Sequence, residues 1–554
     1  MLLLDDKTEV RNTSRTLVGF NELENHHKNV ICPDHPESSL RITRIRELLE
    51  KTGVLDQCDV LTDFLEVDEQ DLELTHNKEM IEKIGNSENM EQDEINTLCT
   101  YFDSVFMTNK SNDASKQAIG CVRDLTHQII NNKAANGFAI IRPPGHHADR
   151  KDPCGFCIYN NVAQAAEEAF LNGADRILIV DLDVHHGNGT QNIFYDDKRV
   201  LYFSIHRYEY GKYWPHLKEG NFDHVGEGSG VGYNANIPLN ETGCGDSDYL
   251  SILFNVLLPL AAQFDPHFVI FSVGFDSCLG DPLGSMLLSP TCYSHIIYHL
   301  KSLAKGRLLL VLEGGYNHQV CAVGVEKCLR ILLGYPPEKI ENLEPVKDST
   351  VVSCLGLISI LRNYWTCFAL YPSKSSMRLS EWPLIEISAE FKYNPEEKPA
   401  DTANIDQENL LKIEENSVMD YQVSKNETMI YYNEGDIRHR DITDSEHPEK
   451  PERTAKIMEK LRDFTLKKSE RIAEDDEILL VHTEQMLNEL KTTQTMTQDE
   501  LDNKMDELDS IFLTNDTLNV AKTSVGTLLQ VGKTLYFSST KTWNPLTHSV
   551  IESE

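Results

Sequence analysis

The sequence predicts an α/β protein with a central parallel sheet. Four short, mainly apolar runs lie between residues 139 and 312, and each is typical of a buried parallel strand. Each run leads into polar or glycine-rich residues, and the chemistry of open α/β sheets gathers at the carboxyl ends of the strands. Core packing alone would not require that repetition, so we expect a functional site where these strand ends meet.

Three of these runs end before side chains that suit catalysis. They are followed by His146 and His147 after residues 139–141, by Asp276 after residues 268–273, and by Tyr316 after residues 308–312. A turn of Pro-Pro-Gly precedes the two histidines, and a Gly-Gly pair precedes the tyrosine. Such small and rigid residues are typical of tight turns at strand ends.

The remaining run, residues 176–180, predicts a metal site. It continues into Asp181, Asp183 and His185 and then into a Gly-Asn-Gly turn. Asp183 and His185 stand two residues apart, so both reach the same side of an extended strand end. Carboxylates mixed with imidazoles suit zinc. The alternative is a buried Asp/His hydrogen-bond cluster that only caps the sheet.

The motifs RPPGHH, DLDVHHGNG, GFDSCLGDPLG and LEGGYN, in this order, resemble those of the zinc-dependent histone deacetylase family, class II. The resemblance runs from about Val18 to about Pro337. It implies an arginase/deacetylase-type fold, in which helices flank the central parallel sheet. It also implies hydrolysis of acetyl-lysine amides with release of acetate.

The resemblance implies a role for each matching polar residue. Asp183, His185 and Asp276 match the zinc ligands, and their number leaves open positions, as in a catalytic zinc site. His146 and His147 match the general base and acid, with the assignment between them open. The other matching residues are Asp181, which would orient His146; Asn188, which would contact His147; and Tyr316, which would stabilise the oxyanion.

A substrate channel is implied in the same way. Aromatic walls around the lysine stem correspond here to Gly155 with Phe156 and to Tyr213 with Trp214; the alternative for Tyr213 is an ordinary core position. Asp103 and Ser104 fall where family members hold the substrate backbone. A structural potassium ion is a further implication, with oxygen ligands from Asp181 and Ser204 and from the carbonyls of Asp183, His185 and Ile205.

One position bears on the substrate. Leu283 stands where a polyamine deacetylase of the family carries a glutamate that attracts a cationic substrate. The region Cys32 to Glu37 also lacks the constricting insertion of that relative. We therefore expect acetylated proteins as substrates, histone or non-histone. The alternatives are acetylated polyamines or other small amines, which Trp214 favours, and a non-catalytic acyl-lysine-binding scaffold, which would need a lost ligand or tyrosine.

The composition of the chain bears on its cellular location and on the kinds of partner it binds. The chain of 554 residues has a formal net charge of −36, which argues against direct nucleic-acid binding. No run of 18 apolar residues appears, and the start of the chain is too short and acidic for a signal peptide. Thirteen irregularly spaced cysteines indicate reduced thiols. We expect a cytoplasmic and/or nuclear protein, no membrane association, and corepressor or cytoskeletal proteins as partners.

The second half of the chain contains an internal repeat. Residues 447–453, 482–486 and 509–515 mirror residues 35–41, 76–80 and 103–109, in that order. No second copy of RPPGHH follows, so we expect a truncated, mainly helical and inactive repeat; a splice form or an incomplete gene model would produce the same pattern. The expected organisation is a catalytic domain at 14–370, a polar linker at 371–426, the partial repeat at 427–541 and a tail at 542–554.

Overall fold

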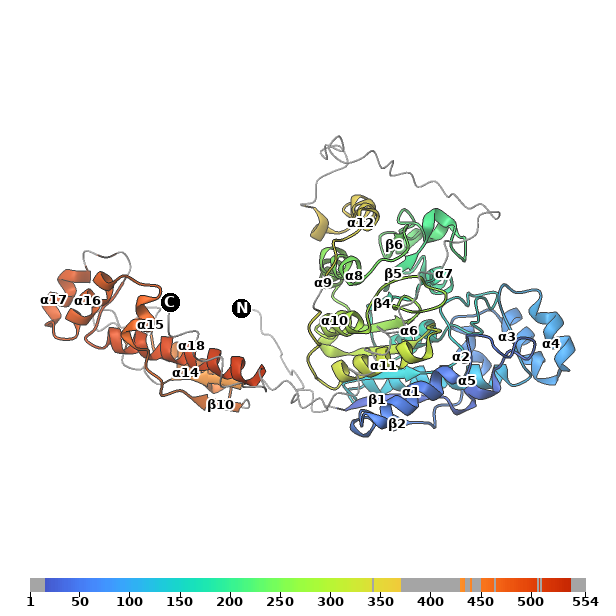
Figure 1. The fold of residues 1–554 in the computed structure, drawn as a ribbon, viewed down its shortest axis with the longest axis horizontal. Coiled ribbons are helices and arrows are strands. Elements are labelled where there is room, and N and C mark those ends of the chain that lie inside the picture. The colour runs from blue at the N-terminus through green and yellow to red at the C-terminus, as the bar shows by residue number, and fades with distance from the viewer. Residues whose placement is uncertain are drawn as a thin grey trace. The chain divides into compact units, whose positions relative to one another are not determined.

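The computed structural model describes residues 15–340, 343–369, 429–433, 439–440, 450–462, 465–505, 508 and 511–539. The expected linker and tail lie outside the described residues. The chain divides into two compact units, 1–425 and 426–554, which we describe separately (Figure 1).

The first unit is built on a parallel sheet of eight strands, as the fold class predicted. The strand order is β2-β1-β3-β8-β7-β4-β5-β6. Their bounds are β1 Thr16–Phe20, β2 Asp59–Leu61, β3 Asn136–Ile140, β4 Ile177–Asp181, β5 Val200–Arg207, β6 Asn234–Leu239, β7 Phe268–Val273 and β8 Leu308–Leu312. The four predicted runs correspond to β3, β8, β7 and β4, which are neighbours in the middle of the sheet.

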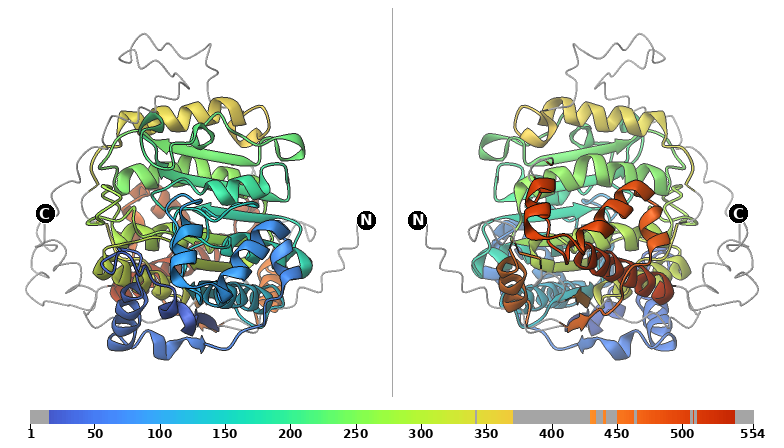
Figure 2. Two further views of the ribbon diagram at one scale, coloured as in Figure 1. Left: turned by 90° about the vertical axis from the view of Figure 1, so that its right-hand side faces the viewer. Right: turned by 90° about the vertical axis from the view of Figure 1, so that its left-hand side faces the viewer.

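Helices cover both faces of this sheet (Figure 2). They are α1 Leu40–Lys51, α2 Glu69–Glu73, α3 Lys78–Asn86, α4 Gln92–Cys99, α5 Ser111–Ile130, α6 Asn161–Leu171, α7 Asn188–Phe194, α8 Asp246–Ile252, α9 Leu258–Phe264, α10 Pro290–Leu300, α11 His318–Leu332 and α12 Asp348–Leu361. Several helices begin at a side-chain cap. The side chains of Asn160, Ser289 and Asn317 accept the N–H of the third residue of α6, α10 and α11, respectively.

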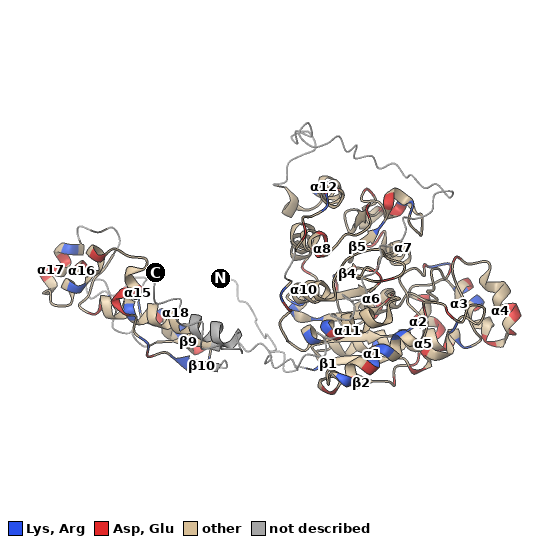
Figure 3. Cartoon of the chain, in the orientation of Figure 1, with Lys and Arg blue, Asp and Glu red and all other residues tan. Residues whose placement is uncertain are grey.

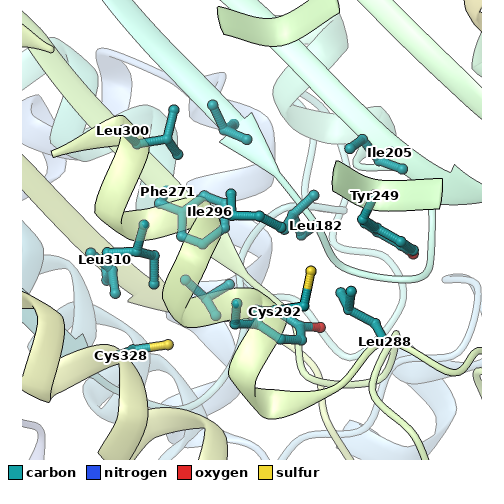
Figure 4. Packing of buried hydrophobic residues seen from close by; sticks show 14 of the residues in the cluster. Leu182, Ile205, Tyr249, Phe271, Leu288, Cys292, Ile296, Leu300, Leu310 and Cys328 are labelled. Atoms are coloured by element: carbon teal, nitrogen blue, oxygen red, sulfur yellow. The ribbon is translucent and has the colours of Figure 1, made fainter. Parts of the chain in front are cut away.

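The two core clusters follow from the two-residue period of the strands. Leu178 and Val180 of β4 pack with α1 and α8 to α12 on one face, whereas Ile177 and Ile179 pack with α5 and α6 on the other. Figure 4 shows the first cluster, in which Phe271 and Leu310 from the sheet meet residues of α10 such as Ile296. Because both strand faces are covered, the strand ends are where side chains reach a site.

A smaller cluster lies beside the sheet, where α2, α3 and α4 pack on α5 through residues such as Leu72, Ile84 and Ile95. Acidic residues are frequent on α2 and α4 (Figure 3). Among the described residues, the helical stretch Asp246–Phe264 is long and apolar enough to span a membrane, but half of it is buried. Tyr249, Val256 and Leu260 of this stretch pack in the first cluster, as expected of a core helix.

The second unit reproduces the start of the first, as the predicted repeat requires. Its described elements are β9 Met429–Tyr432, α14 Glu452–Lys460, β10 Thr465–Lys468, α15 Asp475–Leu479, α16 Glu484–Thr493, α17 Gln498–Met505 and α18 Thr517–Ser539. β9 and β10 pair in parallel as β1 and β2 do. The capping box of α15 (Glu474 and Glu477) matches that of α2 (Asp68 and Asp71), 406 residues earlier.

Candidate active site

The site residues come from the carboxyl ends of the four central strands. His146 and His147 follow β3, Asp181 ends β4 and is followed by Asp183 and His185, Asp276 follows β7, and Tyr316 follows β8. All of these side chains are buried except that of His185, which is 12% exposed. The sheet therefore brings together residues that lie up to 170 positions apart in the chain.

Asp183, His185 and Asp276 form a candidate metal centre. Nδ1 of His185 lies 3.0 Å from Oδ1 of Asp183 and 3.3 Å from Oδ2 of Asp276. Oδ2 of Asp276 is buried and has no hydrogen-bond donor, whereas its Oδ1 accepts the N–H of Val184 at 2.8 Å. Burial and the nearby Asp183 raise the pKa of Asp276. A divalent cation would satisfy the unpaired oxygen and offset the repulsion, so this donor set fits zinc.

Glycines make room for these carboxylates. A Cβ on Gly314 would lie 2.4 Å from Oδ2 of Asp276, and a Cβ on Gly274 would lie 2.2 Å from Oδ2 of Asp183. The N–H of Gly314 also donates to Oδ2 of Asp183 at 2.9 Å. His146, His147 and Asp183 form a second group with metal-ligating atoms close together. Both histidines of that group are already engaged through Nδ1, and they flank the first group.

The tandem histidines have different partners. Nδ1 of His146 donates to Oδ2 of Asp181 at 3.0 Å, and Nδ1 of His147 donates to Oδ1 of Asn188 at 2.8 Å. Burial opposes a charge on His146, but Asp183 and Asp181 outweigh it and raise its pKa to about 10. Burial, His146 and His185 hold the pKa of His147 well below its usual range. The pair therefore combines a charged imidazolium with a neutral imidazole.

Tyr316 is 8% exposed at the edge of the site. Gly315 before it has a φ of +116°, and a Cβ there would clash with Phe275, so the turn requires glycine. Arg41 donates to the carbonyls of Glu313 and Gly315 and lies 5.5 Å from the centre of the Tyr316 ring. Arg41 belongs to α1, so this helix anchors the loop after β8 through these hydrogen bonds.

Most of the expected channel residues lie together. The N–H groups of Gly155 and Phe156 donate to the carbonyls of Asp103 and Ser104, both at 2.9 Å. Nε1 of Trp214 donates to Oδ2 of Asp103 at 3.0 Å. The Trp214 ring lies 4.6 Å edge-on from His147, and that of Phe156 lies 6.1 Å edge-on from Tyr316.

Tyr213 does not share the position of Trp214. Its ring is 7% exposed and stacks on His185, with centroids 5.3 Å apart. Its hydroxyl donates to the carbonyl of Leu283 at 2.9 Å and lies 3.2 Å from Nε2 of His185. The structure therefore places Tyr213 against His185 of the candidate metal centre. Two of the residues expected to bind potassium, Asp181 and Ser204, are paired in register on the neighbouring strands β4 and β5.

Two buried acids near the site were missed by the sequence reasoning. Glu313 accepts the N–H groups of Gly145 (2.6 Å) and His146 (3.1 Å) and thereby orders the histidine turn. Asp281 accepts four backbone N–H groups, from Leu283, Gly284, Tyr316 and Asn317. Glu313 lies in the motif LEGGYN and Asp281 in the motif GFDSCLGDPLG. A motif, however, does not show which distant backbone groups a carboxylate contacts.

Comparisons with known proteins agree with this arrangement. The profile of the histone deacetylase domain matches residues 35–332 and 447–546. Histone deacetylase 6 of Caenorhabditis elegans is 56% identical over 96% of this chain and 56% of its own length. Polyamine deacetylase HDAC10 of Mus musculus is 39% identical over 60% of this chain and 49% of its own.

A solved structure, the HD domain of HDA15, shares the fold with a TM-score of 0.59 and 36% identity. The match covers 64% of this chain and 96% of the HDA15 chain. The chain itself spans about half the length of the curated relatives.

Proposed function

Because the chain belongs to the histone deacetylase family, we propose that its first unit is a zinc-dependent hydrolase of acetyl-lysine amides in proteins. One observation carries the proposal: His185 Nδ1 converges with buried oxygens of Asp183 and Asp276. The tandem histidines and Tyr316 surround this centre. Among the described residues, both groups able to hold a metal lie in the first unit.

Asp183, His185 and Asp276 would hold the zinc ion. Bound there, zinc would polarise the amide carbonyl and acidify a water molecule. His147 is suited to accept the proton of the attacking water, because its Nδ1–H is bonded to Asn188 and its pKa is low, which leaves Nε2 as a neutral base. His146 is held by Asp181, whose carboxylate favours a charged imidazole there, and would stabilise developing negative charge.

Tyr316 would donate its hydroxyl to the oxyanion. The proton held by His147 then passes to the leaving amine, so water and the amide yield acetate and a free lysine amine. Phe156 and Trp214 would enclose the lysine stem, and Asp103 with Ser104 would contact the substrate backbone at the rim. Asp181, Ser204 and the carbonyls of Asp183, His185 and Ile205 would bind the structural potassium ion.

Two features favour a protein substrate over a polyamine. Leu283 supplies no carboxylate to attract a cationic ligand. A cavity of about 770 Å³ opens beside Tyr316 and is lined largely by residues 28–40. It leaves room for residues that flank an acetyl-lysine. The substrates would then be acetylated cytoplasmic or nuclear proteins, histones or cytoskeletal proteins among them.

The test uses the purified full chain with acetyl-lysine peptides and with N-acetylspermidine, before and after a zinc chelator. We expect acetate release from peptides, its loss with the chelator and its return with added zinc. Preferred release from N-acetylspermidine would favour the polyamine alternative. Asp183→Ala and Asp276→Ala should lose zinc together with turnover, whereas the control Asp175→Ala, at an exposed acid, should keep both. Full zinc occupancy in either ligand variant would contradict the assigned ligands.

A further inference from the structure

We infer that the Tyr213 hydroxyl is a positioning group that holds His185 in the tautomer that binds the metal, an inference that rests on the proposed zinc site. The hydroxyl touches two groups, the Leu283 carbonyl at 2.9 Å and Nε2 of His185 at 3.2 Å. The Tyr213 ring is buried and is sandwiched between His185 and the Arg207 guanidinium, which lies 4.1 Å from the ring centre.

The direction of both hydrogen bonds follows from the chemistry of the groups. A carbonyl oxygen can only accept, so the single hydroxyl proton of Tyr213 is donated to Leu283. The hydroxyl can then interact with His185 only as an acceptor, which requires a proton on Nε2. A neutral imidazole with its proton on Nε2 presents a lone pair at Nδ1. That atom is the one that faces Asp183 and Asp276.

The contact supports the metal-binding orientation of the ring. A ligating imidazole must keep its proton on the nitrogen opposite the metal, and a buried N–H without an acceptor is unfavourable. The Tyr213 hydroxyl is the acceptor on that side, while Nδ1 faces the two carboxylates. Loss of the hydroxyl therefore removes a support of the metal-bound ring. Removal of such a partner of a metal ligand typically weakens metal affinity about 10–100-fold.

The loop that anchors the hydroxyl is itself held. Arg207 donates to the Gly284 carbonyl at 3.1 Å, and Asp281 accepts the N–H groups of Leu283 and Gly284. The Leu283 carbonyl is thus a fixed acceptor. A phenylalanine at position 213 would keep the stacking on His185 and remove only the acceptor for Nε2.

The test is the zinc dissociation constant of the full chain, measured by competition with a chromogenic chelator. Tyr213→Phe should raise it about 10–100-fold. The matched control is Tyr159→Phe, which removes another buried hydroxyl, bonded to Asn112 at 2.9 Å in a different cluster. This control should leave the dissociation constant unchanged. The melting temperatures of the metal-free variants should fall by similar amounts.

Equal zinc affinity in Tyr213→Phe and the unmodified protein would overturn the inference, even if the variant were less stable. An equal loss of affinity in Tyr159→Phe would overturn it too, because the effect would then be general. Failure of the unmodified protein to bind zinc would overturn this inference and the proposed metal site together. Weakened zinc binding in Tyr213→Phe without any acetate release by the unmodified protein would support Tyr213 and contradict only the deacetylase activity.

Discussion

The backbone N–H of Tyr316 donates to Oδ2 of Asp281 at 2.6 Å, so the loop after β7 holds the loop after β8. The same oxygen accepts the N–H of Asn317, and the other oxygen accepts those of Leu283 and Gly284. Because all four donors are backbone groups, one carboxylate sets the spacing between the two loops.

Asp281→Asn should lower kcat without loss of zinc. The amide NH₂ group would face backbone donors on one side, and each unpaired buried donor costs about 1–3 kcal/mol, so Tyr316 would shift. We expect a fall in kcat of at least about tenfold with little change in KM. In a Tyr316→Phe background the same substitution should have a much smaller effect. If the reduction in kcat of the double variant equalled the product of the two single reductions, Asp281 would act independently of Tyr316.

Tyr316→Phe should reduce turnover while leaving zinc content and peptide binding nearly intact. The loss of one oxyanion donor typically lowers kcat about 10²–10³-fold. Steady-state kinetics and metal analysis of the same preparation would check this. Wild-type turnover in the variant would make Tyr316 an ordinary packed aromatic residue.

Glu37→Gln should lower the free energy of unfolding in a pH-dependent way. Burial disfavours the Glu37 carboxylate, but Arg142 and Arg41 outweigh burial and hold its pKa at about 2, below the ordinary 4.5. Because the folded pKa is the lower one, the stabilisation is complete above about pH 4.5 and is lost as the pH falls toward 2.

Urea unfolding at a series of pH values would measure this difference. At pH 7 the glutamine variant should be less stable by about 3–5 kcal/mol, the usual cost of breaking a buried pair. The gap should stay constant down to about pH 4.5 and narrow below it. A gap that does not depend on pH would show that the carboxylate charge is not the cause.

Removal of residues 426–554 should spare the chemistry. The cut falls between the two compact units, and the proposed ligands, histidines and tyrosine all lie before residue 317. Zinc content and turnover per folded molecule should match those of the full chain prepared in parallel. A soluble, zinc-loaded first unit without activity would show instead that the second unit orders the active site.

The middle of the sheet could be predicted because β3, β4, β7 and β8 are apolar runs that end abruptly in polar residues. The outer strands could not. β6, for example, buries Asn234 and Asn236, whose side chains donate to Gln191 at 3.1 and 2.9 Å. A buried asparagine is favourable only with such a partner, and Gln191 stands more than forty positions away in α7.

Tyr213 illustrates the same limit within the site. Sequence placed it with Trp214 on the channel wall, whereas in the structure only Trp214 contacts His147 and Asp103. Adjacent side chains in a turn diverge, and the acceptor that turns Tyr213 inward, the Leu283 carbonyl, lies 70 residues further along.

The sequence by itself determined which chemical groups stand at the strand ends, because buried strands and their terminal motifs are local patterns. It thereby determined the middle of the sheet, the repeat, the family and the candidate zinc ligands. The tertiary structure alone decided which atoms of those groups face one another. The supports from Asp281, Glu313, Arg41 and Tyr213 are contacts between loops far apart in the chain, and such contacts exist only once the sheet has brought its strand ends together.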